Sequence, residues 1–264
     1  MSATPPTKDN RMTLTIIGSG NVAWLLAILF KTSGHKINQI YSRNKKTGSA
    51  LSKITGGKFI DDIQKIDSKS DIYIIAINDD SIAEVVSKLP ALNNIVVHTS
   101  GTVDLQILKK KFKKAGVVYP LQSITSESVL SDELTFCLEA TNNTVLTSLK
   151  QLVTSVNCSF VVMNSQKRAK LHLAAVLVNN FTNHLYAQAF SLLKKNRIEF
   201  NLLKPLISHT VKRINGNPAS FQTGPAVRND KKTIQQHLML LKDNKQLADL
   251  YKQLTASIYK FHKK

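Results

Sequence analysis

The sequence has few cysteines, and no apolar run in it approaches the length of a membrane span. Both of its 2 cysteines, Cys137 and Cys158, lie in apolar segments typical of strands, and they form no CxxC pair. This pattern favours buried structural thiols over a disulfide, a nucleophile or a metal site. We therefore predict no metal site and a reduced, cytoplasmic, soluble protein with no membrane partner.

Residues 1–10 also lack the apolar core of a signal peptide. The segment is polar and contains proline, so we predict a disordered tail there. The remaining chain, with 42% hydrophobic residues, is long enough to bury a core in one large domain or two smaller ones.

Acidic residues are scarce, with 17 Asp and Glu against 36 Lys and Arg, and the net charge is +19. Such a charge raises the affinity for any phosphate polymer, which makes nucleic acid a possible partner. The densest basic runs are Lys109–Lys114, predicted to lie late in a surface helix, and Tyr259–Lys264. Since no nucleic-acid-binding motif accompanies them, a solvated basic surface is favoured over a nucleic-acid site.

Glycine is also sparse, but two of the 10 glycines stand in Gly18-Ser19-Gly20, between a β-branched run and an apolar helical pattern. A strand, a glycine-rich turn and a helix in this order are typical of a dinucleotide-binding site, and less so of an ordinary turn. Gly18 allows the tight turn, Gly20 lets a pyrophosphate approach the backbone, and Ala23 takes the third small position. The predicted cofactor-binding residues here are Gly18, Ser19, Gly20, Asn21 and Val22.

The end of the second predicted strand, near Tyr41, indicates which dinucleotide binds. A site for NAD usually carries an acidic residue there, whereas an arginine suits the 2′-phosphate of NADP. This chain has Ser42-Arg43-Asn44 and no acidic residue in reach. We therefore predict NADP as the cofactor, bound by Ser42 and Arg43. The alternative is a solvated basic turn.

The arrangement of apolar runs predicts an α/β fold with two domains. Continuous β-branched strands alternate with helices up to about residue 163, which indicates a parallel, doubly wound Rossmann domain over residues 11–163. Helical patterns then follow over 165–195, 198–214, 230–242 and 244–261, so residues 164–264 form an all-helical domain.

In open α/β sheets the ligand lies beyond the carboxyl ends of the strands. Two predicted strand ends carry polar side chains there, at Asn78 and in the loop 98–101, and we predict that Asn78, His98 and Ser100 contact the cofactor. Asp79 and Asp80 are explained as caps of a helix that starts near Ser81. Gln122, after a further strand, is predicted to contact substrate.

Several segments together resemble one family over nearly the whole chain. They are Val97-His-Thr-Ser-Gly101, Tyr119-Pro-Leu-Gln122, His172-Leu-Ala-Ala-Val-Leu-Val-Asn-Asn180 and Gln222-Thr-Gly-Pro-Ala-Val-Arg-Asn-Asp230 with His237-Leu. The chain resembles bacterial proteins that join a Rossmann-like domain to domain of unknown function 2520. The resemblance implies kinship with pyrroline-5-carboxylate reductases, 3-hydroxyacid dehydrogenases and NADP oxidoreductases of the F420-dependent type. It also implies a helical domain that dimerises and closes the substrate cleft.

The helical domain carries candidate catalytic residues. His172 and Asn179 fall on one face of the predicted helix, as does Asn183. A histidine titrates near neutrality, so His172 is a candidate proton donor to a carbonyl or imine, with Asn179 fixing the substrate atom. In hydroxyacid dehydrogenases, which the chain resembles, a lysine and an asparagine do this work. The alternative is that these polar groups pair within a subunit interface.

Arg228 lies in the motif Thr223–Asp230, in which Gly224-Pro225 predicts a turn and Asp230 a helix N-cap. Arg228 suits a substrate carboxylate through a bidentate contact, or an acidic residue across a dimer interface.

Two functions therefore remain. The first is an NADP(H)-dependent oxidoreductase that reduces a small carbonyl or imine substrate, one that can carry a carboxylate. The alternative is a non-catalytic dinucleotide-binding sensor or interaction protein. We expect a homodimer in either case, because the apolar helical faces need a covering partner.

Overall fold

The computed structural model describes residues 11–125, 134–214 and 216–263, so the predicted tail at 1–10 lies outside the described residues. The chain forms two compact units; the first ends at Asn180 and the second begins at Phe181. This division falls later than the predicted boundary at 163/164. The reason is that helix α6 (Ser165–Ala175) begins with side chains bonded to the first unit, among them Arg168.

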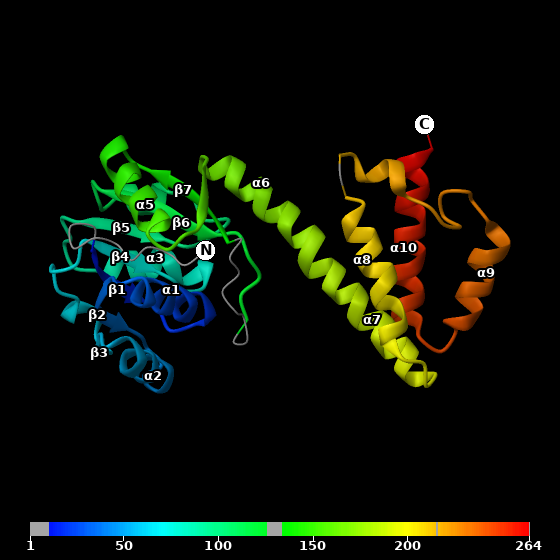
Figure 1. The fold of residues 1–264 in the computed structure, drawn as a ribbon, viewed down its shortest axis with the longest axis horizontal. Coiled ribbons are helices and arrows are strands. Elements are labelled where there is room, and N and C mark those ends of the chain that lie inside the picture. Colours follow the sequence, from blue (N-terminus) through cyan, green and yellow to red (C-terminus); the bar gives the residue numbers. More distant parts are fainter. Residues whose placement is uncertain (1–10, 126–133, 215, 264) are drawn as a thin grey trace. The chain divides into compact units, whose positions relative to one another are not determined.

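The first unit is built on a sheet of eight strands in the order β3-β2-β1-β4-β5-β6-β7-β8 (Figure 1). The first six strands are parallel, in the order expected of a doubly wound dinucleotide-binding sheet. Their bounds are Thr13–Ile17, Lys36–Tyr41, Lys58–Ile60, Ile72–Ile75, Ile95–His98 and Ala115–Pro120 for β1 to β6.

The prediction of a parallel sheet is wrong for the last two strands. Strand β7 (Thr135–Ala140) pairs antiparallel with β6, and β8 (Ser159–Val162) pairs parallel with β7. A parallel neighbour needs a crossover connection, whereas an antiparallel one only needs the chain to turn back. Parallel and antiparallel strands have similar apolar runs in the sequence, so these runs do not predict the direction of a strand.

Helices cover both faces of this sheet. Helices α1 (Asn21–Thr32), α2 (Lys45–Thr55) and α5 (Asn143–Thr154) supply Leu26, Leu51 and Leu149 to the core on one face. On the other face, α3 (Asp79–Lys88) and α4 (Gln106–Lys109) supply residues such as Val85 and Leu108. A short 3-10 turn, Ile63–Lys65, packs there too. Because both faces are covered, every residue of β4 is fully buried, as its continuous apolar run predicts.

The predicted helix over 165–195 forms, but with an interruption. Helix α6 passes into a π-helical turn, Val176–Phe181, and the chain continues as α7 (Thr182–Lys195). A π turn closes i→i+5 hydrogen bonds and so holds one more residue than an α turn. The three- and four-residue spacing that predicts a face shared by His172 and Asn179 therefore does not hold at Asn179, which lies inside this turn.

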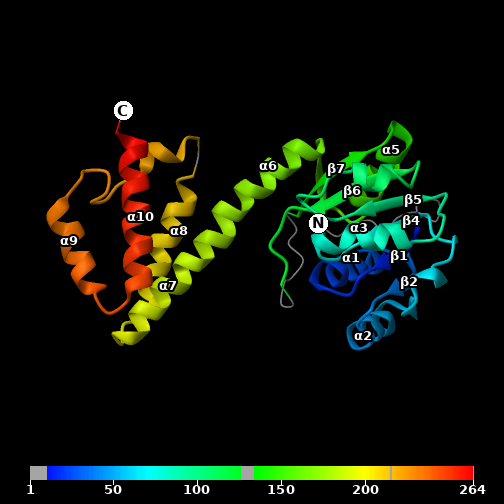
Figure 2. The same ribbon diagram turned by 180° about the vertical axis from the view of Figure 1, so that it is seen from behind.

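The second unit is helical, as predicted (Figure 2). Besides α7 it contains a 3-10 turn (Phe200–Leu203), α8 (Lys204–Lys212), a second 3-10 turn (Pro218–Phe221), α9 (Lys231–Leu240) and α10 (Lys245–His262). Asp230 caps α9 by accepting a hydrogen bond from the Thr233 N–H, which confirms its predicted role. No helix in the described part of the chain combines the length and apolarity needed to cross a bilayer.

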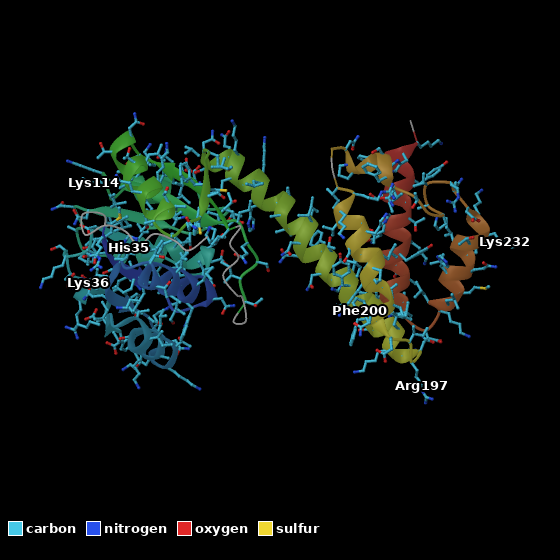
Figure 3. The ribbon with its side chains drawn as sticks, in the orientation of Figure 1. His35, Lys36, Lys114, Arg197, Phe200 and Lys232 are labelled. Atoms are coloured by element: carbon cyan, nitrogen blue, oxygen red, sulfur yellow. The ribbon has the colours of Figure 1, made fainter. Side chains whose placement is uncertain are left out.

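Most basic side chains lie on the surfaces of the two units, with Arg168 a fully buried exception. Figure 3 shows Lys36 and Lys114 at the outside of the first unit and Arg197 and Lys232 at the outside of the second, and all four are exposed. Within Lys109–Lys114, Lys111 has a structural task that the sequence did not predict. Its ammonium group donates to the carbonyls of Val86, Ser87 and Leu89, so it satisfies the end of α3 rather than that of its own short helix.

The cysteines are both free. Cys137 is buried in β7, as predicted, and burial raises the pKa of its thiol. Cys158 precedes β8 and is only partly buried, so the prediction of a buried thiol is wrong there. The reason is that β8 is the last strand of the sheet and leaves much of its length exposed.

Candidate functional site

A cavity of about 750 Å³ lies at the carboxyl ends of β1, β2 and β4. Strand order reverses between β1 and β4, and this is where open α/β sheets bind their ligands. The cavity brings together eight of the predicted cofactor residues from segments far apart in the sequence. Its lining consists of Gly18–Val22, Tyr41–Asn44, Ala76–Asn78, Ser81, Val85 and Ile124.

The two glycine positions of the turn differ in how much room they leave for a side chain. Gly18 has φ +129°, and a Cβ atom there would lie 2.1 Å from the carbonyl oxygen of Ala76. Gly20 has ordinary backbone angles, and a Cβ atom there would meet nothing within 4 Å. Gly18 is therefore required by the fold itself, whereas Gly20 leaves an open approach to the backbone.

Gly20 is also the N-cap of α1, and it provides no side-chain cap. Within the described residues, the first N–H groups of α1 consequently lack intrahelical or side-chain partners, and they lie at the positive end of the helix dipole. Asn21 does not supply a cap either, because its side chain donates to the carbonyl of Ile124, 3.3 Å away. A helix N-terminus in this state is suited to a phosphate group.

Hydroxyl groups connect the glycine turn to the end of β2. The Ser19 hydroxyl lies 2.7 Å from the Ser42 hydroxyl and 2.6 Å from that of Thr47, in the first turn of α2. Ser42 also accepts a hydrogen bond from the Asn44 N–H. These contacts hold the loop that carries Arg43, whose side chain is exposed and has no ion pair within the described residues. An uncompensated guanidinium beside hydroxyl groups can bind a phosphate.

Lys45, two residues on, is already engaged. Its ammonium lies 3.0 Å from a carboxylate oxygen of Asp61, and this contact lowers the pKa of Asp61. Both side chains are largely exposed, so the pair contributes little to stability. Arg43 is thus the basic side chain of this loop that lines the cavity.

Asn78 lines the cavity and precedes α3, which begins at Asp79. The prediction that the helix starts near Ser81 with acidic caps is wrong. The reason is that the Asp79 carboxylate is used elsewhere, accepting hydrogen bonds from the hydroxyls of Ser100 and Thr102. Asp79 therefore ties the start of α3 to the loop after β5.

That loop also determines what Ser100 and His98 can do. The Ser100 hydroxyl donates to Asp79 and accepts from the N–H groups of Thr102 and Val103, at 3.0 and 2.9 Å. Ser100 is buried and His98 is fully buried, and neither lines the cavity. Their predicted contacts with the cofactor have no support in this geometry.

His98 is kept neutral in the interior. Its Nδ1 accepts a hydrogen bond from the Ser100 N–H, and Nε2 is buried without a partner among the described residues. Burial, with the positive charge of Arg168 as a smaller cause, lowers the pKa of His98 to about 4. A neutral buried imidazole of this kind organises the loop rather than supplying protons at neutral pH.

His172 lies at the same edge of the sheet, against the end of the loop. Its Nδ1 is 3.0 Å from the hydroxyl of Tyr119, at the end of β6, and the two rings pack edge to face. A Cβ atom at Gly101 would lie 2.5 Å from that Nδ1. His172 does not line the cavity. The loop that it contacts follows β5, and β5 pairs with β4, the strand that leads to Asn78. His172 is half-buried.

A buried ion pair places the start of α6. The guanidinium of Arg168, which is fully buried, contacts the carboxylate of Glu139 in β7 and the carbonyl of Val103. The Ser165 hydroxyl donates to the same carboxylate at 2.7 Å and accepts from the Leu105 N–H. Arg168 stands one helical turn before His172, so this cluster also sets the position of His172.

The remaining predicted residues are less tightly placed. The side-chain oxygen of Gln122, just beyond β6, is buried without a partner among the described residues. Asn179 is exposed in the π-helical turn. Arg228 is exposed in the second unit. No cluster of His, Cys, Asp or Glu suited to a metal ion occurs within the described ranges.

Sequence reasoning missed three contributors. Thr47 was not distinguished from other polar residues of α2, and Gly101 and Tyr119 were noted only as parts of motifs. A tyrosine at the carboxyl end of a strand is a signal in principle. Its partner is 53 residues away, however, and a single sequence does not reveal such a pairing.

Comparison with known proteins places both halves of the chain. Residues 2–122 match the model of a Rossmann-like domain, and residues 134–258 match that of domain of unknown function 2520. No curated protein matches the chain significantly.

Among solved structures, a protein from Bacteroides fragilis, provisionally named an NADP oxidoreductase, is 31% identical with a TM-score of 0.87. The match covers 95% of this chain and 99% of that protein. An imine reductase from Myxococcus stipitatus, solved with NADP+, is 16% identical with a TM-score of 0.65, over 94% of this chain and 92% of its own.

A 1-pyrroline-5-carboxylate reductase from Streptococcus pyogenes is 15% identical with a TM-score of 0.61, over 96% of this chain and 99% of its own. At this level of identity, the likeness to the imine reductase and to the pyrroline reductase concerns the fold.

Proposed function

Because the chain belongs to the family that joins a Rossmann-like domain to domain of unknown function 2520, we propose that it is an NADPH-dependent oxidoreductase. Its substrate would be a small carbonyl compound or imine. The observation that carries the proposal is the cavity at the β1/β4 reversal, with an uncapped helix N-terminus and Arg43 in its wall. The names of the Bacteroides protein and of the imine reductase agree with this choice of cofactor.

The residues present fit NADP in three respects. Gly20 leaves open space where a pyrophosphate would approach, and the free N–H groups of α1 face a negative charge favourably. Arg43 would pair with the 2′-phosphate, with the linked hydroxyls of Ser19 and Ser42 beside it. Among the described residues, no carboxylate lines the cavity to hold a bare ribose or to repel that phosphate.

Reduction of a carbonyl or imine needs a hydride at carbon, which bound NADPH supplies, and a proton at oxygen or nitrogen. We assign the proton to His172, whose half-buried side chain lies at the same edge of the sheet as the cavity. Asn179 and Gln122 would orient the substrate. Arg228 would bind a carboxylate on the substrate.

The cofactor assignment is tested by titrating the protein with NADPH and with NADH while following nucleotide fluorescence. Replacing Arg43 by alanine is expected to weaken NADPH binding by about 10- to 100-fold, since a hydrogen bond to a charged group is worth about 1.5–3 kcal/mol. NADH binding should change little, because NADH lacks the 2′-phosphate. Lys53→Ala removes the same charge from an exposed site in the last turn of α2 and serves as the control.

Equal loss of both nucleotides in Arg43→Ala would contradict the phosphate contact. Failure of the unaltered protein to bind either nucleotide would contradict the oxidoreductase proposal as a whole. Tight binding with no turnover of any carbonyl or imine would instead favour the non-catalytic sensor.

We also propose that the protein is a homodimer that associates through its second unit. Within the described residues of that unit, Ala226 and Leu241 are the apolar side chains that are buried. Large apolar side chains stay exposed there; Leu202 is 71% and Leu206 62% exposed. Monomeric proteins rarely expose so much apolar surface, and a second copy would cover it.

Light scattering after size exclusion is expected to give twice the mass of the 29.3 kDa chain. Leu206→Asp should shift the protein towards monomer. As a control, Lys204→Asp alters an exposed polar position of the same helix. A monomeric unaltered protein would refute the proposal.

A further inference from the structure

Tyr119 makes the contact that defines how the His172 ring is held. Its hydroxyl lies 3.0 Å from Nδ1, and the ring centroids are 5.8 Å apart at an interplanar angle of 69°. The two residues come from β6 and α6, the latter anchored by the buried Arg168–Glu139 pair. Both partners thus project from regular structure, which favours a defined geometry over a chance contact.

The loop after β5 is shaped to admit this ring. A Cβ atom on Gly101 would lie 2.5 Å from Nδ1 and 2.8 Å from Cγ of His172, so a larger residue would displace the imidazole. Gly101 has no unusual φ that would by itself require glycine. The hydrogen bonds of Ser100 with Asp79, Thr102 and Val103 hold the loop at this distance.

The chemistry of the pair decides which atom donates. Burial is the main cause that raises the pKa of Tyr119, so the phenol keeps its proton at neutral pH. The structure records no other hydrogen bond of that hydroxyl within the described residues. When the imidazole is neutral, the phenol can donate to Nδ1, and the ring proton then resides on Nε2.

We propose that Tyr119 is a positioning residue that holds the neutral ring of His172 in the Nε2–H tautomer, with Nε2 turned towards the substrate. A hydroxyl suits this task because it donates to Nδ1 of a neutral ring and accepts from Nδ1–H of a protonated one. The ring therefore keeps its orientation in both states. The inference rests on the proposed function, in which His172 delivers a proton. In that step the protonated ring donates Nε2–H to the substrate, and the neutral ring left behind carries its proton on Nδ1, from which the Tyr119 hydroxyl accepts a hydrogen bond.

The first test reads the tautomer directly, without cofactor or substrate. Full-length protein labelled with ¹⁵N in its histidines is examined by NMR at about pH 9, above the ordinary histidine pKa of about 6.5, with His172→Gln to assign the signals. We expect a proton on Nε2 in the unaltered protein and a mixture of tautomers in Tyr119→Phe. Tyr73→Phe is the control, because its hydroxyl bonds to Asp67 and Ser70 elsewhere.

Gly101→Ala is the second variant, since it moves the imidazole and leaves Tyr119 in place. It should disturb the tautomer as Tyr119→Phe does. If the tautomer is the same in the unaltered protein and in both variants, the inference is wrong. A phenylalanine preserves the ring packing, so a purely packing role of Tyr119 would leave the signal of Tyr119→Phe unchanged.

The second test measures NADPH oxidation with 2-methyl-1-pyrroline as an imine probe. Tyr119→Phe is expected to lower kcat by about 10- to 100-fold, within the range for a disturbed general acid, and to alter its pH dependence. NADPH affinity should stay unchanged. An unchanged kcat and pH profile would overturn the inference. If the unaltered protein does not bind NADPH, the proposed function is wrong instead. The measurement of the His172 tautomer would still test the role assigned to Tyr119.

Discussion

Replacing Arg168 by methionine is expected to lower the free energy of unfolding by about 3–5 kcal/mol, as measured by urea denaturation. Methionine fills similar volume without a charge, so the carboxylate of Glu139 is left largely buried and without its cation. The carbonyl of Val103 loses its donor as well. A buried group that loses its partner suffers the full cost of desolvation.

Two comparisons make this prediction specific. Glu84→Gln breaks the exposed pair with Lys88, and a loss of less than about 0.5 kcal/mol is expected there. Arg168→Met combined with Glu139→Leu removes both charges and should recover much of the loss, because buried pairs can often be exchanged for apolar residues. A single variant as stable as the unaltered protein would show that the pair does not hold α6 on the sheet.

Gly18→Ala is expected to affect mainly the stability of the protein, and Gly20→Ala mainly its affinity for NADPH. At Gly18, the positive φ and the carbonyl of Ala76 at 2.1 Å leave no room for a methyl group, so stability should fall by more than about 2 kcal/mol. At Gly20, nothing lies within 4 Å, and stability should change by less than about 1 kcal/mol. NADPH affinity should nevertheless fall in Gly20→Ala, because the methyl group occupies the approach to the backbone.

Thermal denaturation and nucleotide titration of the two variants separate these effects. A Gly20→Ala protein that binds NADPH as tightly as the unaltered protein would contradict the position assigned to the pyrophosphate. A stable Gly18→Ala protein would contradict the tight packing of the turn against the end of β4. The pair thus tests the fold and the cofactor site by changing single methyl groups two residues apart.

Much of the cofactor site followed from short segments. The glycine turn, Ser42, Arg43 and Asn78 all line the cavity, because each follows a strand directly and parallel strands place such positions at one edge. His98 and Ser100 also stand at the end of a strand, but they are buried and do not line the cavity. Their loop folds back over them, held by hydrogen bonds of Ser100 to residues at its far end and in α3.

By itself, the sequence determined the local elements: the runs that form strands, the helical second unit, the cap at Asp230 and the glycine turn before α1. These depend on residues close together along the chain, as in the cap, where Asp230 accepts a hydrogen bond from the N–H of Thr233, only three positions further on. The tertiary structure alone decided the reversed direction of β7 and β8, the π-helical turn at Asn179 and the meeting of Tyr119 with His172. The strand direction and the contact of Tyr119 with His172 arise from pairing between segments far apart in the sequence, and local propensity carries no information about such pairing.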